Sequence, residues 1–126
     1  MSTNIALVSE ARQWLDQLDE DLRQELGDYM GAGWDFLYRM ESEIRKYRGE
    51  MLDAIKTALG YWLESDDDGK FLCGLWLIER LDATEHIPEL EEIRRQVLLG
   101  TSHLPASYLQ WVDLALQKLQ GPNTVK

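Results

Sequence analysis

The sequence predicts an all-α fold of about six or seven antiparallel helices in a single domain, residues 1–126. Apolar residues recur at three- and four-residue steps from one end of the chain to the other, which is the period of an amphipathic helix. Alternation with period two is missing and β-branched residues are sparse, so strands are not expected. The connections are short and polar, which favours packing of sequence neighbours as hairpins.

The first two helices are expected at about 4–18 and 20–30. Each segment carries its apolar residues on one stripe, and the second ends at the glycines of "GAG", residues 31–33. The two stripes consist of Ile5, Val8, Ala11, Trp14, Leu15 and Leu18, and of Leu22, Leu26, Tyr29 and Met30.

The next apolar stripe begins near Trp34 and continues to Trp62, with Gly49 in its middle. A glycine in a helix interior costs about 1 kcal/mol relative to alanine. One long bent helix and two helices meeting at Gly49 both fit this pattern, and we favour two.

The fifth segment, residues 69–81, is apolar on nearly all sides, which is typical of a central helix covered by several neighbours. Its small residues Cys73 and Gly74 would let another helix approach closely. Cys73 is the one cysteine of the chain, so an internal disulfide is excluded. Its apolar surroundings predict a buried thiol that is a poor nucleophile.

The last two helices begin at prolines. Pro88 in "IPEL" suits the first turn of a helix, where its missing N–H costs nothing, and this helix should run to Leu99 and end at Gly100. The seventh helix opens at Pro105 in "LPAS" and carries apolar residues as far as Leu119. Residues 119–126 are expected as a frayed tail.

The net charge of −10 arises from 13 basic and 23 acidic residues and is unevenly distributed. Residues 1–38 carry −6 and residues 60–92 carry −8, whereas the other two segments are slightly positive. A negative field repels phosphate backbones and steers the protein toward basic surfaces. Direct nucleic-acid binding is therefore disfavoured; the alternative is that the acidity only keeps the protein soluble.

The stretch "ESDDDGK", residues 64–70, is the most suggestive acidic segment. Aligned as a calcium loop, it places Glu64, Asp66 and Asp68 correctly, but the position that needs a bidentate Glu is Leu75. As a turn, it supplies Asp67 or Asp68 as the N-cap of the following helix. Three adjacent carboxylates exceed what a cap requires, which leaves a binding role open.

Two further acidic clusters can likewise have either a structural role or a binding role. Glu89, Glu91 and Glu92, with Glu85 before them, fall near the start of the sixth helix, where Arg94 and Arg95 can pair with Glu91 and Glu92. A third cluster in the N-terminal region faces only Arg23, and each cluster alone is typical of a solvated helix face. This third cluster consists of Asp16, Asp19, Glu20, Asp21, Glu25 and Asp28.

Motifs of catalysis and of metal binding are missing from the sequence. His86 and His103 lie in turns without a metal-ligand spacing, and no nucleophile elbow or phosphate-binding glycine loop occurs. The N-terminus lacks the pattern of a signal peptide and no apolar run approaches the roughly 20 residues of a membrane span. We therefore expect a cytoplasmic binding protein that is not an enzyme and has no cofactor, metal or membrane contact.

The segment "FLCGLWLIERLDATEHIPELEEIRRQVL", residues 71–98, resembles one unit of the HEAT-like helical repeats. It has an apolar first helix with small residues inside, a short polar turn, and "IPEL" opening a second amphipathic helix. The resemblance implies a short stack of helix pairs, with a plain helical bundle as the alternative, and a role as a protein-binding scaffold.

In size, charge and architecture the chain is also similar to small acidic immunity proteins of bacterial toxin systems, including contact-dependent inhibition. That resemblance implies an inhibitor that neutralises a basic partner, for example a nuclease toxin. The alternative is a helical adaptor or regulatory subunit with an apolar groove. The predicted partner-binding residues are Tyr61, Glu64, Asp66, Asp67, Asp68, Glu85, Glu89 and Glu92. For Tyr61 and every Trp, core packing is the alternative role.

Overall fold

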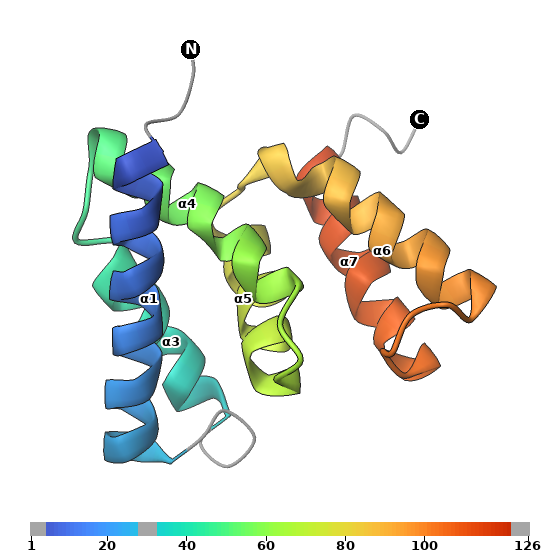
Figure 1. The fold of residues 1–126 in the computed structure, drawn as a ribbon, viewed down its shortest axis with the longest axis horizontal. Coiled ribbons are helices and arrows are strands. Elements are labelled where there is room, and N and C mark those ends of the chain that lie inside the picture. The colour runs from blue at the N-terminus through green and yellow to red at the C-terminus, as the bar shows by residue number, and fades with distance from the viewer. Residues whose placement is uncertain (1–4, 28–32, 122–126) are drawn as a thin grey trace. The chain divides into compact units, whose positions relative to one another are not determined.

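The computed structural model of the chain describes residues 5–27 and 33–121 (Figure 1). Every regular element in those residues is a helix, which confirms the predicted all-α fold. In chain order the elements are α1 (Ile5–Leu26), α3 (Trp34–Ile44), α4 (Gly49–Leu63), α5 (Asp68–Arg80), η1 (Thr84–His86), α6 (Ile87–Leu99), η2 (Ala106–Tyr108) and α7 (Leu109–Gln120).

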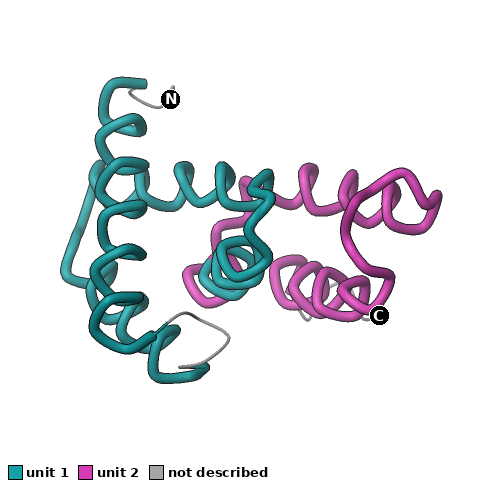
Figure 2. Tube along the Cα trace, turned by 60° about the horizontal axis from the view of Figure 1, so that its bottom comes forward, with its two compact units in different colours: residues 1–77 teal, residues 78–126 magenta. Residues whose placement is uncertain are grey.

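The chain divides into two compact units, residues 1–77 and residues 78–126, which Figure 2 distinguishes by colour. Unit 1 contains α1, α3, α4 and most of α5, and unit 2 contains η1, α6, η2 and α7. The segment 71–98, which resembles a HEAT-like unit, crosses this division. Both that resemblance and the single domain remain predictions.

Helix α1 is continuous from Ile5 to Leu26, so the prediction of two helices at 4–18 and 20–30 is wrong in this part of the chain. The acidic pair at residues 19–20 does not interrupt the helix, because neither residue has a strong helix-breaking effect. Gly27 follows the helix with a φ of 88°. Residues 28–32, which include Tyr29, Met30 and part of "GAG", lie outside the described residues.

In unit 1, α1 packs against α4 and α3 around a core of large apolar side chains. Gly49 has a φ of 62° and separates α3 from α4 after the extended residue Arg48. The prediction of two helices meeting at Gly49 is therefore confirmed. The largest fully buried side chains of unit 1 are Leu15, Phe36, Leu37, Met40, Ile44, Ile55, Leu59, Phe71 and Leu77.

Helix α5 approaches α4 closely, as its small residues predict. A Cβ atom added to Gly74 would lie 2.9 Å from the Cβ of Trp62 and 3.6 Å from the carbonyl oxygen of Leu59. Atoms at the first of these distances would overlap, so only glycine fits without a shift of one helix. Gly74 thus fixes how α5 lies on α4, and Phe71 and Cys73 on the same helix are fully buried.

In unit 2, α6 and α7 lie side by side (Figure 1). Pro88 stands in the first turn of α6, and Gly100 ends the helix in the left-handed conformation, as predicted. Helix α7 includes Leu119 and Gln120, which the sequence assigned to the frayed tail, because Leu119 is buried in the core. The rest of that tail, residues 122–126, lies outside the described residues.

No helix within residues 5–27 and 33–121 combines the length and the apolar character needed to cross a lipid bilayer.

Candidate functional site

The predicted partner-binding residues fall into two groups. Tyr61, Glu64 and the aspartates 66–68 lie in unit 1, at the end of α4 and in the turn that leads into α5. Glu85, Glu89 and Glu92 lie in unit 2, in η1 and α6.

In the turn before α5, Asp67 is the N-cap residue. Its Oδ1 accepts a hydrogen bond from the backbone N–H of Lys70 at 3.2 Å, and its own N–H donates to Oγ of Ser65 at 3.0 Å. The cap satisfies an N–H at the start of α5 that has no partner within the helix. The prediction that Asp67 or Asp68 caps this helix is confirmed for Asp67.

The carboxylate of Asp67 has a second function, because its Oδ2 lies 3.1 Å from a guanidinium nitrogen of Arg23 on α1. Partial burial opposes ionisation, but the N–H of Lys70 and the Arg23 guanidinium outweigh it and hold the pKa of Asp67 below its usual value.

Replacing Asp67 separates these two functions. Asp67→Ala removes the cap and the ion pair and should lower the free energy of unfolding by about 1–2 kcal/mol. Asp67→Asn keeps an oxygen for the cap and loses only the charge, so it should cost less than about 1 kcal/mol. Urea denaturation at neutral pH measures both. Equal losses from the two variants would contradict the capping function.

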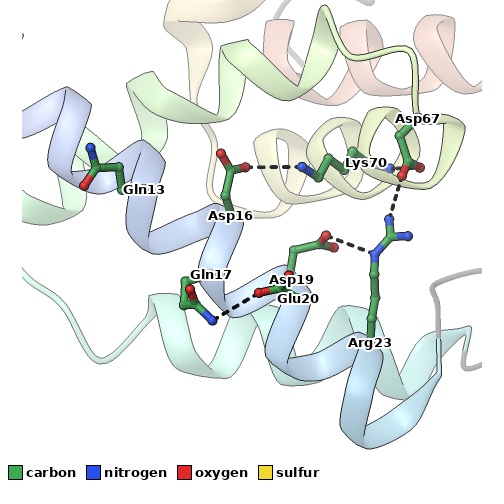
Figure 3. A pocket seen from close by; sticks show the side chains of 8 residues that line it. All are labelled: Gln13, Asp16, Gln17, Asp19, Glu20, Arg23, Asp67 and Lys70. Carbon is green, nitrogen blue, oxygen red and sulfur yellow. Dashed lines mark hydrogen bonds and ion pairs between the residues drawn. The ribbon is translucent and has the colours of Figure 1, made fainter.

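Arg23 also pairs with a buried carboxylate on its own helix. Its Nε lies 2.9 Å from Oδ2 of Asp19, one helical turn earlier, so the guanidinium bridges Asp19 and Asp67 (Figure 3). The pKa of Arg23 is raised: partial burial opposes its charge, but the two carboxylates outweigh that effect. The bridge connects α1 to the start of α5.

Asp19 is the most unusual polar residue of unit 1, because only 4% of its surface is exposed. Its burial raises the pKa of the carboxyl group, and the Arg23 guanidinium only partly opposes that effect. The second oxygen, Oδ1, is buried and has no hydrogen-bond partner among the described residues. Nε of Arg23 is likewise buried without a hydrogen-bond partner, although it lies 2.9 Å from Oδ2 of Asp19, so this ion pair leaves polar atoms of both side chains unsatisfied. A buried oxygen without a donor costs about 1–3 kcal/mol.

Asp19 lines an open hollow of about 520 Å³ between α1 and the start of α5, which we call the acidic hollow (Figure 3). Four carboxylates and two cations surround it, together with two amide side chains, so the side chains contribute a net charge of about −2 when all are ionised. The acidic hollow is lined by Gln13, Asp16, Gln17, Asp19, Glu20, Arg23, Asp67 and Lys70.

Asp16 is held in place at the edge of the acidic hollow. Its Oδ1 accepts a hydrogen bond from the indole Nε1 of buried Trp62 at 2.9 Å and lies 3.5 Å from Nζ of Lys70. The orientation of this carboxylate is therefore fixed from α4 and from α5, while it remains accessible from the hollow.

Of the predicted site residues, only Asp67 lines the acidic hollow; sequence analysis missed the contribution of Asp16, Asp19 and Glu20. It had assigned their cluster to a solvated helix face, which is wrong for Asp19. The sequence did contain a signal that Asp19 is buried. Asp19 lies four residues after Leu15 and three before Leu22, and both leucines belong to the buried stripe of α1. Asp28, in the same cluster, lies outside the described residues.

The other predicted residues of unit 1 are at the surface. Tyr61 is 42% exposed, and the guanidinium of Arg12 lies 4.0 Å from the centre of its ring, so the ring is partly covered by a cation–π contact. Glu64 and Asp66 are exposed, and their carboxylates form no ion pair with any described residue. Asp68 is also exposed, in the first turn of α5.

In unit 2, basic side chains of the chain itself contact part of the predicted acidic group. Arg95 pairs with Glu92 and holds the pKa of that carboxyl below its usual value, as the spacing predicts. Glu89 lies 3.6 Å from Nδ1 of the buried His86. Arg94 pairs with Asp113 on α7 at 2.6 Å, not with Glu91, because the two helices bring Asp113 within its reach.

Three aromatic rings meet at the surface of unit 1. Trp34 and Tyr38 on α3 are 61% and 55% exposed, and both contact Trp76 on α5 with ring centroids 6.1 and 5.9 Å apart. Trp34 and Trp111, which is half exposed in unit 2, contradict the alternative that every Trp belongs to the core; Trp62 agrees with it. Tyr38 lies within the apolar stripe that begins near Trp34, but more than half of its surface is exposed.

Cys73 is fully buried, and this burial raises the pKa of its thiol far above the usual range, which makes it a poor nucleophile. Within residues 5–27 and 33–121, no three His, Cys, Asp or Glu side chains are grouped so as to hold a metal ion.

No family model matches the chain, and neither a curated protein nor a solved structure does.

Proposed function

We propose that the chain is a non-enzymatic binding protein that recognises a basic surface on another protein through the carboxylates of unit 1. The observation that supports this proposal best is Asp19, a carboxylate that is buried at a cost to stability beside an open hollow of negative charge. Residues that destabilise a fold in this way are typical of functional sites.

The exposed carboxylates around the α4–α5 turn extend the same charge. The ion pairs of Asp67 with Arg23 and of Asp16 with Lys70 use both cations of the acidic hollow, and Glu64 and Asp66 have no cation of their own among the described residues. An unbalanced field of this kind accelerates association with a basic partner.

The finer proposal is an immunity or antitoxin-like inhibitor that neutralises a toxin, for example a nuclease domain, in the cytoplasm. A nuclease that binds a phosphate backbone presents a basic cleft, and a net charge of −10 is complementary to it. The inhibitor would act by covering the cleft, without a cofactor and without contacting nucleic acid itself.

The proposal predicts a strongly salt-dependent association. The immobilised chain should retain a basic protein from a lysate of its own cells, and the association rate of that purified protein should fall on the order of tenfold between low and high salt. A bait with Glu20→Gln, Glu64→Gln and Asp66→Asn should bind more slowly at low salt. If the partner is a toxin, its expression alone arrests growth and co-expression with the wild-type chain relieves the arrest.

A control bait makes the same change of charge elsewhere. Glu10→Gln, Glu50→Gln and Asp53→Asn alter exposed carboxylates of unit 1 that do not line the acidic hollow. Equal slowing by the two sets would show that only the total charge acts. A partner whose association does not respond to salt would contradict the proposal.

One observation favours the alternative, a helical adaptor that binds through apolar contacts. The rings of Trp34, Tyr38 and Trp76 form an exposed aromatic surface, and aromatic residues often provide much of the energy of an interface. If Trp34→Ala abolishes retention while the acidic variants bind at the normal rate in any salt, the adaptor is the correct function.

A further inference from the structure

The aromatic surface of unit 1 consists of three rings that gather outside the core. The rings of Trp34 and Tyr38 on α3 are inclined by only 24°, with centroids 5.9 Å apart, and Trp76 on α5 meets them at 61° and 69°. Trp34 and Tyr38 remain 61% and 55% exposed, so they gain little from burial for side chains of their size. Exposed apolar side chains that adjoin one another in this way are typical of an interaction site.

No basic side chain of the described residues lies over the two exposed rings. The structure has no cation–π contact at Trp34 or at Tyr38 within residues 5–27 and 33–121. Arg39, which follows Tyr38 in the chain, instead donates two hydrogen bonds to Glu25 on α1, at 2.8 and 3.2 Å. The exposed sides of both rings are therefore available to a cation of another molecule.

The charge of unit 1 favours such a cation. Residues 1–77 include 16 acidic and 8 basic residues, which gives a net charge of −8. Asp35, next to Trp34 in the chain, is exposed, and its carboxylate forms no ion pair with a described residue. The face of an aromatic ring is itself negative because of its quadrupole. A cation that approaches Trp34 or Tyr38 is thus attracted both by the ring and by the net charge of the unit.

We propose that the aromatic surface binds an arginine side chain of the basic partner, with the guanidinium stacked on the exposed rings of Trp34 and Tyr38. This inference rests on the proposed function, because it names a side chain through which that partner is recognised. The carboxylates of unit 1 attract the partner over a longer range, whereas the rings act on contact. The carboxylates therefore set mainly the rate of association, and the aromatic surface contributes to the lifetime of the complex.

The chemistry of the rings favours arginine over lysine. A guanidinium is planar and weakly hydrated, so it can lie flat on a ring, whereas an ammonium is a strongly hydrated point charge. The chain contains one example of this contact, because the guanidinium of Arg12 lies 4.0 Å from the ring centre of Tyr61. The neighbouring rings of Trp34 and Tyr38 offer a guanidinium a larger area, and tryptophan gives the strongest cation–π contact.

The test is a titration of the full-length, ¹⁵N-labelled protein with N-acetyl-arginine-N-methylamide, followed through the indole N–H signals of the tryptophans. We expect saturable shifts of the signals of Trp34 and Trp76, and no shift of Trp111, which is half exposed in unit 2. The corresponding citrulline compound has nearly the same shape without the charge. It should bind about twofold to fivefold more weakly, as the loss of an exposed cation–π contact requires, and the lysine compound should also bind more weakly.

Two leucine substitutions form a matched pair. Trp34→Leu keeps an apolar side chain and removes the ring, so it should weaken arginine binding, followed at Trp76, by about twofold to fivefold. Trp111→Leu removes an exposed tryptophan outside the aromatic surface and should leave arginine binding unchanged. The same spectra show whether each variant is folded, and Tyr38→Leu repeats the test if Trp34→Leu is not.

Equal affinity for the arginine and citrulline compounds, equal effects of the two leucine substitutions, or shifts that do not saturate would each overturn the inference. The proposed function is tested separately, by salt-dependent retention of a basic partner. If that retention persists while the titration fails, the proposed function stands and only the arginine site is wrong. If the wild-type chain retains no basic partner, the proposed function fails and the inference fails with it.

Discussion

Replacing Gly74 by alanine should destabilise the protein by about 1–3 kcal/mol, even though alanine is the better helix former. The added Cβ would lie 2.9 Å from the Cβ of Trp62, an atom close to the backbone of α4 that cannot move by a change of rotamer. One helix must therefore shift, and the packing of Phe71 and Cys73 on α5 shifts with it. Urea denaturation compared with the wild type measures the loss.

The sign of the change decides this prediction. At a helix position with free space, Gly→Ala raises the free energy of unfolding by up to about 1 kcal/mol. A more stable Gly74→Ala variant would therefore show that α5 does not approach α4 as closely as the structure has it. The variant should also weaken the function of the acidic hollow, because Asp67 and Lys70 at the start of α5 move with the helix.

Local signals in the sequence predicted much of the fold. Gly49 separates two helices because a positive φ is open to glycine, and Pro88 and Gly100 mark the two ends of α6 through their own backbone preferences. Each of these signals acts within a few residues. Boundaries that depend on one residue type and its neighbours were therefore predictable.

The candidate site depends on residues that are far apart in the sequence. Asp19 lies at the predicted boundary between two helices, yet it is buried within one continuous helix. It pairs with Arg23, which also pairs with Asp67, 44 positions further along the chain. Helical periodicity places Asp19 on the buried stripe, but it does not show that a cation will be available there. The contact of Trp34 and Tyr38 with Trp76 on another helix likewise depends on residues that are far apart in the sequence.

The distinction between a structural and a functional carboxylate can be tested with Arg23. Arg23→Met removes the cation shared by Asp19 and Asp67 and leaves Asp19 as a buried charge without its partner. Breaking a buried pair in this way costs about 3–5 kcal/mol, and because the guanidinium is partly exposed we expect about 2–3 kcal/mol at pH 7. Thermal and urea unfolding measure the loss.

The loss should depend on pH in a defined direction. Burial raises the pKa of folded Asp19 above its ordinary value of 3.8, and removing Arg23 raises it further, so the folded state binds the proton more tightly than the unfolded state. The penalty is therefore small below pH 4 and develops as pH rises through the folded pKa. Other carboxylates titrate in both proteins, so the measured quantity is the difference between variant and wild type.

A second substitution provides the control. Adding Asp19→Asn to Arg23→Met removes the buried charge, and should recover most of the lost stability at pH 7 and abolish the pH dependence of the difference. Asp19→Asn alone should be neutral or slightly stabilising at pH 7. If Asp19→Asn alone is as destabilising as Arg23→Met, the carboxylate serves the fold, and the argument that it is kept for binding is wrong.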